Sequence, residues 1–155
     1  MPTLYVVATP IGNLGDMTPR AIETLKSVSL IAAEDTRVTM KLCSAFDIPT
    51  PLTSCHEHNE RGKAAQIVAR MLEENIDVAV TTDAGTPCIS DPGSILTAEA
   101  VKAGIEVVAV PGPTAMASAL SVSGLDVTEF TFFGFLPRQK NELKETRTIS
   151  ETSRT

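Results

Sequence analysis

The sequence predicts an α/β domain built on a mostly parallel sheet with flanking helices. Short apolar stretches typical of buried strands alternate with longer stretches in which apolar residues recur at helical spacing. Glycine, proline and capping residues stand between the two kinds of stretch, where the chain has to turn. This alternation favours parallel pairing, because each helix returns the chain to the starting edge of the sheet before the next strand.

The first half of the chain shows the alternation from its start. Residues 4–8 form a short apolar run typical of a buried strand. Thr18 and Pro19 then open a helix, because Thr suits the N-cap and Pro suits the first turn. Residues 29–33 form a second apolar strand, and the helix that follows it is expected to end near residue 45.

The second half continues the same alternation. In its longest helix Ile67, Val68 and Met71 share one face, and Gly104 stands where the C-terminal cap of the next helix favours glycine. The elements predicted here are strands at 52–55, 77–82, 106–110 and 130–135, and helices at 60–74, 94–103 and 113–121.

The composition indicates a soluble chain of one-domain size. It has 155 residues, of which 43% are hydrophobic and 21% charged. No apolar run approaches the roughly 20 residues of a membrane span, and the N-terminus lacks the basic region and the cleavage site of a signal peptide. Cys43, Cys55 and Cys88 are an odd, widely spaced set, which argues against a disulfide framework and favours the cytoplasm.

The charge is uneven along the chain. The net charge is −6, and the polar tail at 137–155 carries +2, which leaves −8 on residues 1–136. We therefore expect one α/β domain at 1–136 followed by a polar linker or tail. An acidic domain binds phosphate backbones weakly, so a nucleic-acid substrate would need a basic surface from outside residues 1–136.

Polar clusters follow each of the first five predicted strands. In an open α/β sheet, ligands bind outside the carboxyl ends of the strands, so these clusters predict one ligand site. The cluster after the fourth strand is unusually long, because a strand-to-helix link needs only about 2–6 residues. The clusters are "TPIGNLGDMT" at 9–18, "EDTR" at 34–37, "HEHNER" at 56–61, "DAGTPCISDPG" at 83–93 and "PGPTA" at 111–115.

Several familiar motifs are missing from these clusters. The first loop has neither the G-x-G-x-x-G of a dinucleotide site nor the G-K-[ST] of a P-loop. His56 and His58 alternate, but two histidines and a glutamate without a third ligand at usable spacing do not make a zinc site, so no metal is expected. In the fifth loop Gly112 allows close backbone approach to a ligand, and Thr114 with Ala115 opens a helix facing the same edge.

The motifs "LYVVATPIGNLGDMTPRAIETLKSVSLIAAEDTR", "HEHNER", "TTDAGTPCISDPG" and "VVAVPGPTAMASAL" resemble the tetrapyrrole (corrin/porphyrin) methylase family. Within it they are similar to the bacterial branch that methylates the 2′-oxygen of a cytidine in small-subunit ribosomal RNA. The likeness runs from residue 1 to about 138. Porphyrin-methylating members have Gly-Pro-Gly-Asp in the first loop and Gly-Gly-Asp-Pro in the fourth, whereas this chain has "PIGN" and "AGTP".

This resemblance implies S-adenosylmethionine as the cofactor, ribosomal RNA of the small subunit as the substrate, and a homodimer. It also implies a second domain after about residue 137, which the tail of this chain does not resemble. By resemblance, the cofactor-side residues are Pro10, Asp83, Gly85, Ile89, Ser90, Thr114 and Ala115. Their loop neighbours Ile11, Gly12, Pro111 and Gly112 complete the predicted cofactor site.

The predicted catalytic residues are Glu34, Asp35, Arg37 and His56. A ribose hydroxyl is a weak nucleophile, so a general base would help, and the acidic and histidine side chains at this edge all remain candidates. Arg37 or Arg20 could contact RNA phosphate through its guanidinium. Two other functions stay open: methylation of a tetrapyrrole carbon, and a non-catalytic domain that binds the cofactor without its catalytic half.

Overall fold

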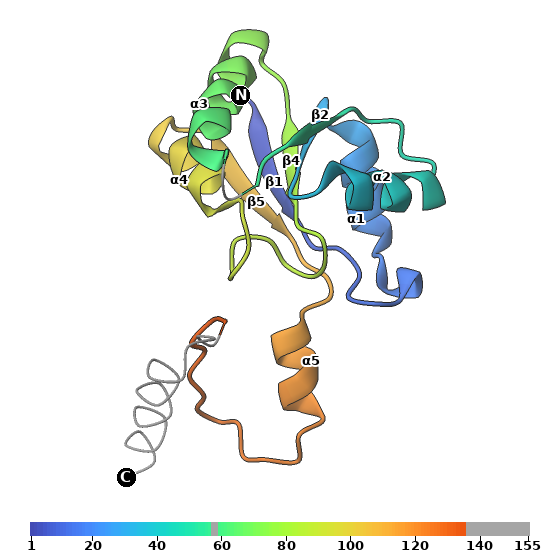
Figure 1. Ribbon diagram of the computed structural model, residues 1–155. Helices are drawn as coiled ribbons and strands as arrows, with labels where there is room; N and C mark the ends of the chain where they lie inside the picture. The colour runs from blue at the N-terminus through green and yellow to red at the C-terminus, as the bar shows by residue number, and fades with distance from the viewer. Residues whose placement is uncertain (57–58, 136–155) are drawn as a thin grey trace. The chain divides into compact units, whose positions relative to one another are not determined.

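Five parallel strands form the centre of the protein (Figure 1). The computed structural model describes residues 1–56 and 59–135. The strands lie in the order β3-β2-β4-β1-β5, so β4 separates β1 from β2. This confirms the predicted α/β class with a parallel sheet. The strands are β1 (Thr3–Val7), β2 (Leu30–Ala33), β3 (Leu52–Ser54), β4 (Val78–Thr81) and β5 (Glu106–Val110).

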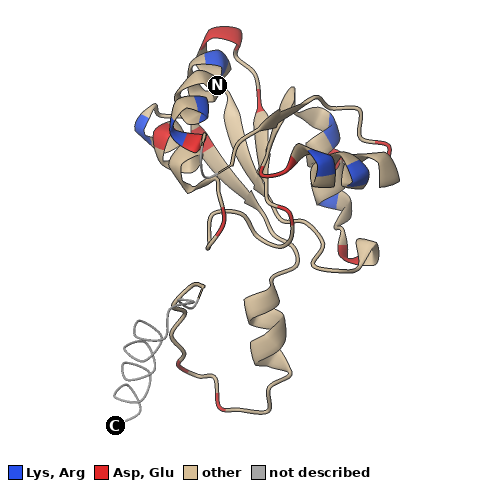
Figure 2. Cartoon of the chain, in the orientation of Figure 1, with Lys and Arg blue, Asp and Glu red and all other residues tan. Residues whose placement is uncertain are grey.

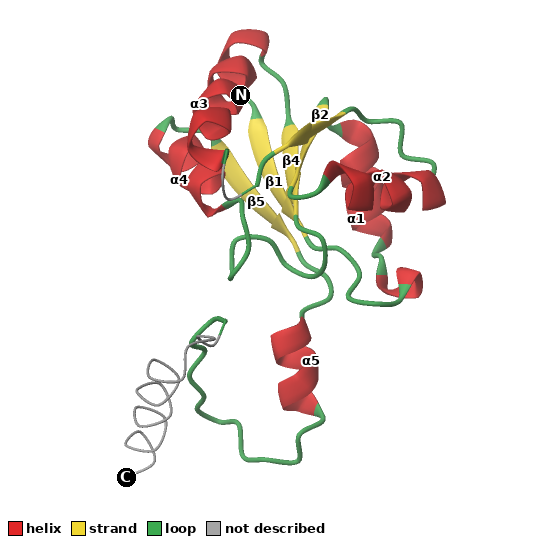
Figure 3. Ribbon diagram, in the orientation of Figure 1, coloured by secondary structure: helices red, strands yellow, loops and turns green. Residues whose placement is uncertain are grey.

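Helices cover both faces of the sheet (Figure 3). The pairs α1 and α2 pack on one face and α3 and α4 on the other. The chain first moves outward from β1 to β3 and then reverses to place β4 beside β1. Because such crossovers are right-handed, helices before and after the reversal fall on opposite faces. The helices are α1 (Pro19–Ser27), α2 (Thr36–Ala45), α3 (Glu60–Glu74), α4 (Ser94–Lys102) and α5 (Ala115–Ser121), with a 3₁₀ turn η1 (Leu14–Asp16).

The central strands are buried on both faces. Every residue of β2 and β4 is buried. Within β4, Val78 and Val80 belong to the core beneath α3 and α4, whereas Ala79 belongs to the core beneath α1 and α2. Successive side chains along a strand point to opposite faces of the sheet, and here both faces are covered by helices. The sequences of these strands are therefore continuously apolar rather than alternately apolar and polar.

Two of the helix starts are capped by side chains. Thr18 Oγ1 accepts a hydrogen bond from Ala21 N at 3.1 Å, with Pro19 in the first turn, as the sequence predicts. Asp35 caps α2 by accepting from Arg37 N at 2.8 Å. Helix α2 therefore already includes Thr36 and Arg37, which the sequence analysis assigned to the loop before it.

The strand predicted at 130–135 is wrong, because these residues form no strand in the structure. Residues Met1–Leu125 form one compact unit and the chain from Asp126 belongs to a second. A strand needs a neighbour for its backbone hydrogen bonds, and within the described residues none pairs with this stretch. Its phenylalanines are exposed, from 42% for Phe133 to 81% for Phe135.

Two further expectations concern a membrane span and the domain boundary. Within the described residues, no helix combines the length and the apolar character that crossing a membrane requires. The tail at 137–155 lies outside the described residues, so the domain boundary at 136 stays a prediction.

Candidate functional site

A crevice is expected at the carboxyl end of β4. The chain leaves β1 and β2 toward helices on one face of the sheet, whereas it leaves β4 toward α4 on the other face. Loops that diverge in this way between neighbouring strands leave an opening, which is where open α/β sheets bind ligands. The strand order therefore places the opening between the loops that follow β1, β2 and β4.

The loop after β4 is tied to the loop after β1. Thr9 and Gly85 exchange two backbone hydrogen bonds, of 2.9 Å from Thr9 N and 3.0 Å from Gly85 N. Thr9 Oγ1 also donates to Thr82 O at 3.2 Å. Gly85 has φ +89°, and a Cβ there would lie 3.4 Å from Ile11 Cγ2. The long fourth loop thus crosses back over the end of β1 before it reaches α4.

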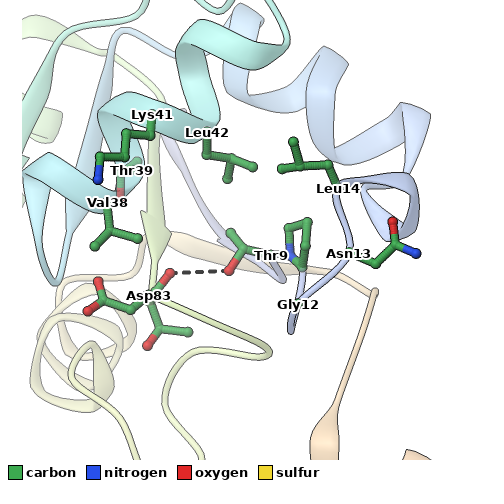
Figure 4. A pocket seen from close by; sticks show the side chains of 11 residues that line it. Thr9, Gly12, Asn13, Leu14, Val38, Thr39, Lys41, Leu42 and Asp83 are labelled. Atoms are coloured by element: carbon green, nitrogen blue, oxygen red, sulfur yellow. Dashed lines mark hydrogen bonds between the residues drawn. The ribbon is translucent and has the colours of Figure 1, made fainter.

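A cavity of about 340 Å³ opens beside this crossing, and we call it the rim cavity (Figure 4). Figure 4 shows Leu14 of η1 and Leu42 of α2 pointing toward one another across it, with Val38 and Asp83 on the α2 side. Its walls are mostly apolar, and its polar residues come from the strand ends, from Asn13 before η1 and from α2. The lining residues are Thr9, Pro10, Gly12, Asn13, Leu14, Val38, Thr39, Lys41, Leu42, Thr82 and Asp83.

Glu34 connects the loop after β2 to the loop after β4. Its Oε2 accepts from Thr82 Oγ1 at 2.5 Å and from Asp83 N at 3.1 Å. In return, Asp83 Oδ1 accepts from Asp35 N at 3.1 Å. The two loops therefore hold each other through carboxylates and backbone N–H groups, which fixes the acidic side chains at this edge.

Asp35 and Arg37 form a bidentate ion pair at the start of α2. Arg37 Nε donates to Asp35 Oδ1 at 3.1 Å, and the second contact, to Asp35 Oδ2, is 2.7 Å long. The hydrogen bonds from Arg37 lower the pKa of Asp35 to about 2. The Arg37 side chain is nevertheless 85% exposed, so its guanidinium remains open to a further partner.

The charges at this edge are mostly negative. Every Lys and Arg of the described residues lies in one of the helices α1 to α4, whereas the loops at the carboxyl ends of the strands carry acidic residues (Figure 2). Partial desolvation, and then the nearby Glu34 carboxylate, raise the pKa values of Asp83 and Asp91. Such a setting attracts a positively charged ligand group such as a sulfonium or an ammonium.

The structure brings the predicted catalytic residues together. Glu34, Asp35, Arg37 and His56 line one hollow of about 390 Å³ with Asp83, here called the Glu34 hollow. They come from the loops after β2 and β3 and the first turn of α2, so the prediction that these loops meet at one edge holds for them.

The predicted cofactor residues divide into four groups. Pro10, Gly12 and Asp83 line the rim cavity. Ile11 and Gly112 line a hollow of about 370 Å³ near α5, here called the Gly112 hollow. Gly85 lies between the two, because its added Cβ would also lie 3.8 Å from Pro113 O. The remaining predicted residues line none of these three hollows: Ile89, Ser90, Pro111, Thr114 and Ala115.

Sequence reasoning missed the α2 side of the rim cavity. Val38, Thr39, Lys41 and Leu42 line it, but they were taken only as part of a helix with its core contacts. The signal was present in Asp35, a good N-cap residue, which starts the helix at the edge and turns its first residues toward the ligand side.

Sequence reasoning also missed the part played by Glu60, the first residue of α3. This residue is only 4% exposed, and its Oε1 accepts hydrogen bonds from three backbone N–H groups at the start of α4. These donors are Gly93 N and Ile95 N, both at 2.8 Å, and Leu96 N at 3.2 Å. Glu60 therefore caps a neighbouring helix and fixes the far end of the 83–93 loop.

The cysteines and the described histidine, His56, belong to no ligand cluster found within 1–56 and 59–135. Among the described residues, no group of three or more His, Cys, Asp or Glu side chains is placed to hold a metal ion. All three cysteines are free, and burial raises the pKa of Cys55 to about 11. A buried thiol of that kind packs rather than reacts.

Comparison with known proteins identifies the fold and its relatives. The family model of tetrapyrrole (corrin/porphyrin) methylases matches residues 3–155. A solved uroporphyrin-III-C-methyltransferase from Thermus thermophilus superposes with a TM-score of 0.60 at 22% identity, covering 83% of this chain and 55% of that one. A conserved hypothetical protein from Aeropyrum pernix gives 0.65 at 22% identity, covering 84% and 45%. These two likenesses show a shared fold.

Closer relatives carry the name ribosomal RNA small subunit methyltransferase I. The protein from Synechocystis sp. is 52% identical over 157 residues, covering 96% of this chain and 56% of the relative. The protein from Pseudomonas aeruginosa is 54% identical over 135 residues, covering 87% and 48%. The chain thus spans about half the length of these curated relatives. Since the family model matches nearly all of its residues, the chain belongs to the tetrapyrrole (corrin/porphyrin) methylase family.

Proposed function

We propose that this chain is the N-terminal part of an S-adenosylmethionine-dependent methyltransferase acting on small-subunit ribosomal RNA, at the 2′-hydroxyl of a cytidine. One observation carries the proposal. The loops that resemble the ribosomal RNA branch in sequence meet at one edge, where the Thr9–Gly85 pair joins the first to the fourth. The names of the close relatives support the same substrate.

The residues at this edge fit the cofactor. The fifth loop packs closely on the end of β1, because a Cβ on Gly112 would lie 3.0 Å from Ala8 Cβ. The acidic groups nearby suit the positive charge of the sulfonium and of the methionine ammonium. When bound, S-adenosylmethionine supplies an electrophilic methyl group. The chain would hold it with Pro10, Ile11, Gly12, Asp83, Gly85, Ile89, Ser90, Pro111, Gly112, Thr114 and Ala115.

The Glu34 hollow would bind the RNA substrate. Asp35 holds the Arg37 guanidinium in place, and the exposed face of that guanidinium can donate to an RNA phosphate. A carboxylate with a pKa of about 2 is a weak base, so the part of Asp35 is to orient Arg37 rather than to accept a proton. Glu34 and His56 remain as acceptors for the proton of the ribose hydroxyl.

The chemistry asked of these residues is mainly positioning. The ribose oxygen forms a bond to the methyl carbon as the carbon–sulfur bond breaks, and the hydroxyl proton passes to the base. Holding the reactants in line can lower the barrier by up to roughly 7–11 kcal/mol. The proposal extends to a homodimer located in the cytoplasm, where ribosomal RNA is found, with the rest of the cofactor pocket supplied by the part of the relatives that this chain does not span.

The first test is a calorimetric titration of S-adenosylmethionine into this chain. A longer protein, in which the C-terminal half of the Synechocystis relative follows residue 136, serves as the comparison. We expect the longer protein to bind the cofactor and to methylate small ribosomal subunits. Binding by both would mean that the loops of this chain suffice for the cofactor. Binding by neither would overturn the cofactor assignment.

A further inference from the structure

The rim cavity shares Pro10, Gly12 and Asp83 with the proposed cofactor site, but its wall on α2 has no part in that site or in the contact of Arg37 with phosphate. We propose that it receives the target base of the RNA, a cytosine turned out of its stack, with Asp83 reading the amino group and Lys41 contacting the phosphate of the same nucleotide. This inference rests on the proposed function and deepens it. Enzymes that do chemistry on a base take it out of the stack into a pocket of this kind, and a base turned out in this way carries its ribose with it.

The position of the cavity suits a base. It shares Asp83 with the Glu34 hollow and has Pro10 and Gly12 in its wall, which belong to the predicted cofactor side. The base and the 2′-oxygen sit on neighbouring carbons of one ribose. A base in the rim cavity therefore leaves its ribose at the boundary with the cofactor residues, where the reacting oxygen has to be.

The size and lining also suit a single base. The cavity volume of about 340 Å³ is in the lower part of the range for small-molecule sites, enough for one nucleoside but not for a stacked run. Leu14 and Leu42 approach from opposite sides, and Val38 lies beside them (Figure 4). Leu14 is 53% exposed and Val38 is 39% exposed, so apolar surface is already available to cover the faces of a ring.

Asp83 supplies the means to distinguish cytosine from uracil. One of its oxygens, Oδ1, accepts from Asp35 N, while Oδ2 takes part in no hydrogen bond within the described part of the chain. A carboxylate accepts from the amino group at position 4 of cytosine. Uracil carries a carbonyl oxygen there instead, which the carboxylate repels.

Lys41 supplies positive charge at the edge of the cavity. It is the one basic residue among those that line it, and its side chain is exposed. Figure 4 shows it on the same side as Val38 and Asp83. The loops around it are acidic, so a phosphate attached to the bound nucleoside would be drawn to this side chain in preference to the loops.

The test is a titration of cytidine 5′-monophosphate into the 155-residue chain, followed by the ¹³C methyl resonances of Leu14, Val38 and Leu42. We expect these resonances to shift, while the exposed Leu72 of α3 and Val101 of α4, on the other face of the sheet, do not. Uridine 5′-monophosphate should bind at least about fivefold more weakly, the lower end of a single base contact. Asp83→Asn should bring the two affinities together.

A matched pair of lysines tests the phosphate contact. Lys41→Ala should weaken the monophosphate about two- to fivefold, as expected for an exposed ion pair, without changing the affinity for cytidine itself. Lys26→Ala removes an equal charge from the end of α1 and should change neither.

Three outcomes would overturn the inference: no methyl shifts at millimolar nucleotide, shifts confined to the Gly112 hollow, or equal binding of the cytidine and uridine compounds. Adding S-adenosylmethionine to the same samples separates this inference from the proposed function. Shifts near Ile11 and Gly112 with the cofactor alone would leave the methyltransferase proposal standing while the base site falls. A chain that responds to neither ligand would overturn the base site, and the longer protein would then decide the methyltransferase proposal.

Discussion

The Asp35–Arg37 pair places one oriented cation in an acidic edge. Asp35 serves both as the N-cap of α2 and as the bidentate partner of Arg37, so the start of the helix and the direction of the guanidinium are set by one carboxylate. A cation fixed in this way selects where a phosphate can lie, which a mobile side chain in the same position would not.

This pair has a measurable acid titration. The pKa of Asp35 is lowered from the ordinary 3.8 to about 2, so the pair stabilises the fold above about pH 4 and that contribution is lost as the pH falls toward 2. Arg37→Ala should return the pKa of Asp35 toward 3.8. Arg37→Lys should give an intermediate value, because it keeps the charge but loses the fork of two hydrogen bonds. The carboxyl ¹³C shift of Asp35 against pH reports each value.

Asp126 provides the internal control for that titration. Its pKa is also lowered, but by hydrogen bonds from Thr128, so it should titrate identically in all three proteins. If Asp35 kept its low pKa after Arg37→Ala, the N-cap bonds of α2 rather than the ion pair would be responsible.

At the residue level the sequence allowed part of the site to be predicted. It indicated that Glu34, Asp35, Arg37 and His56 would meet, because each follows a parallel strand. It could not indicate that Glu34 binds Thr82, since that contact spans 48 positions and depends on which strands are neighbours. The rim cavity was missed for the same reason.

At the level of elements, the contact of Glu60 with α4 joins α3 to a loop of the site. Glu60 is the first residue of α3 and the loop 83–93 ends at α4, so its three hydrogen bonds fix the start of α3 to the end of that loop. Movement of the loop 83–93 is therefore limited at its far end by a buried carboxylate, which leaves the end near β4 to respond to a ligand.

Removing this carboxylate should destabilise the chain. Glu60→Ala leaves the N–H groups of α4 without their acceptor in a buried place, and we expect a loss of about 2 kcal/mol or more in the free energy of unfolding. Glu60→Gln keeps an acceptor oxygen and should lose less. Glu73→Ala, at the exposed end of the same helix, should stay within about 0.5 kcal/mol of the parent. Urea denaturation measures all three, and equal losses for Glu60→Ala and Glu73→Ala would contradict the cap.

Most element bounds followed from local chemistry, such as Thr18 and Pro19 at α1 and the apolar runs of the central strands. The strand predicted at 130–135 failed because a run of aromatic residues shows only that a stretch suits a sheet. A strand also needs a neighbour, and within the described residues neither edge strand, β3 or β5, pairs with this stretch. The local sequence does not show whether such a neighbour is present.

At the level of the whole molecule, the sheet should show a gradient of stability. Strand β4 has neighbours on both sides and is buried throughout, whereas residues 130–135 have no strand partner within the described residues. Amide hydrogen exchange at Ala79 and Val80 should approach the rate set by global unfolding, while Phe132 and Phe133 should exchange orders of magnitude faster. Comparable protection in both stretches would restore the predicted strand.

The alternation of elements predicted the parallel sheet and the single edge that carries the ligand loops. It left the strand order undetermined, because short links allow more than one arrangement and only packing selects among them. The order decides the site, since Thr9 meets Gly85 because β1 neighbours β4, and Glu34 reaches Thr82 because β2 neighbours β4.

The insertion of β4 between β1 and β2 also constrains how the chain is made. The first strand to be synthesised, β1, finds both of its neighbours, β4 and β5, in the second half of the chain. A nascent chain that ends before Val78 can pair only β2 with β3. We therefore expect the first loop to stay unanchored until β4 has been synthesised, so that the ligand-binding edge is assembled after the β2–β3 pair.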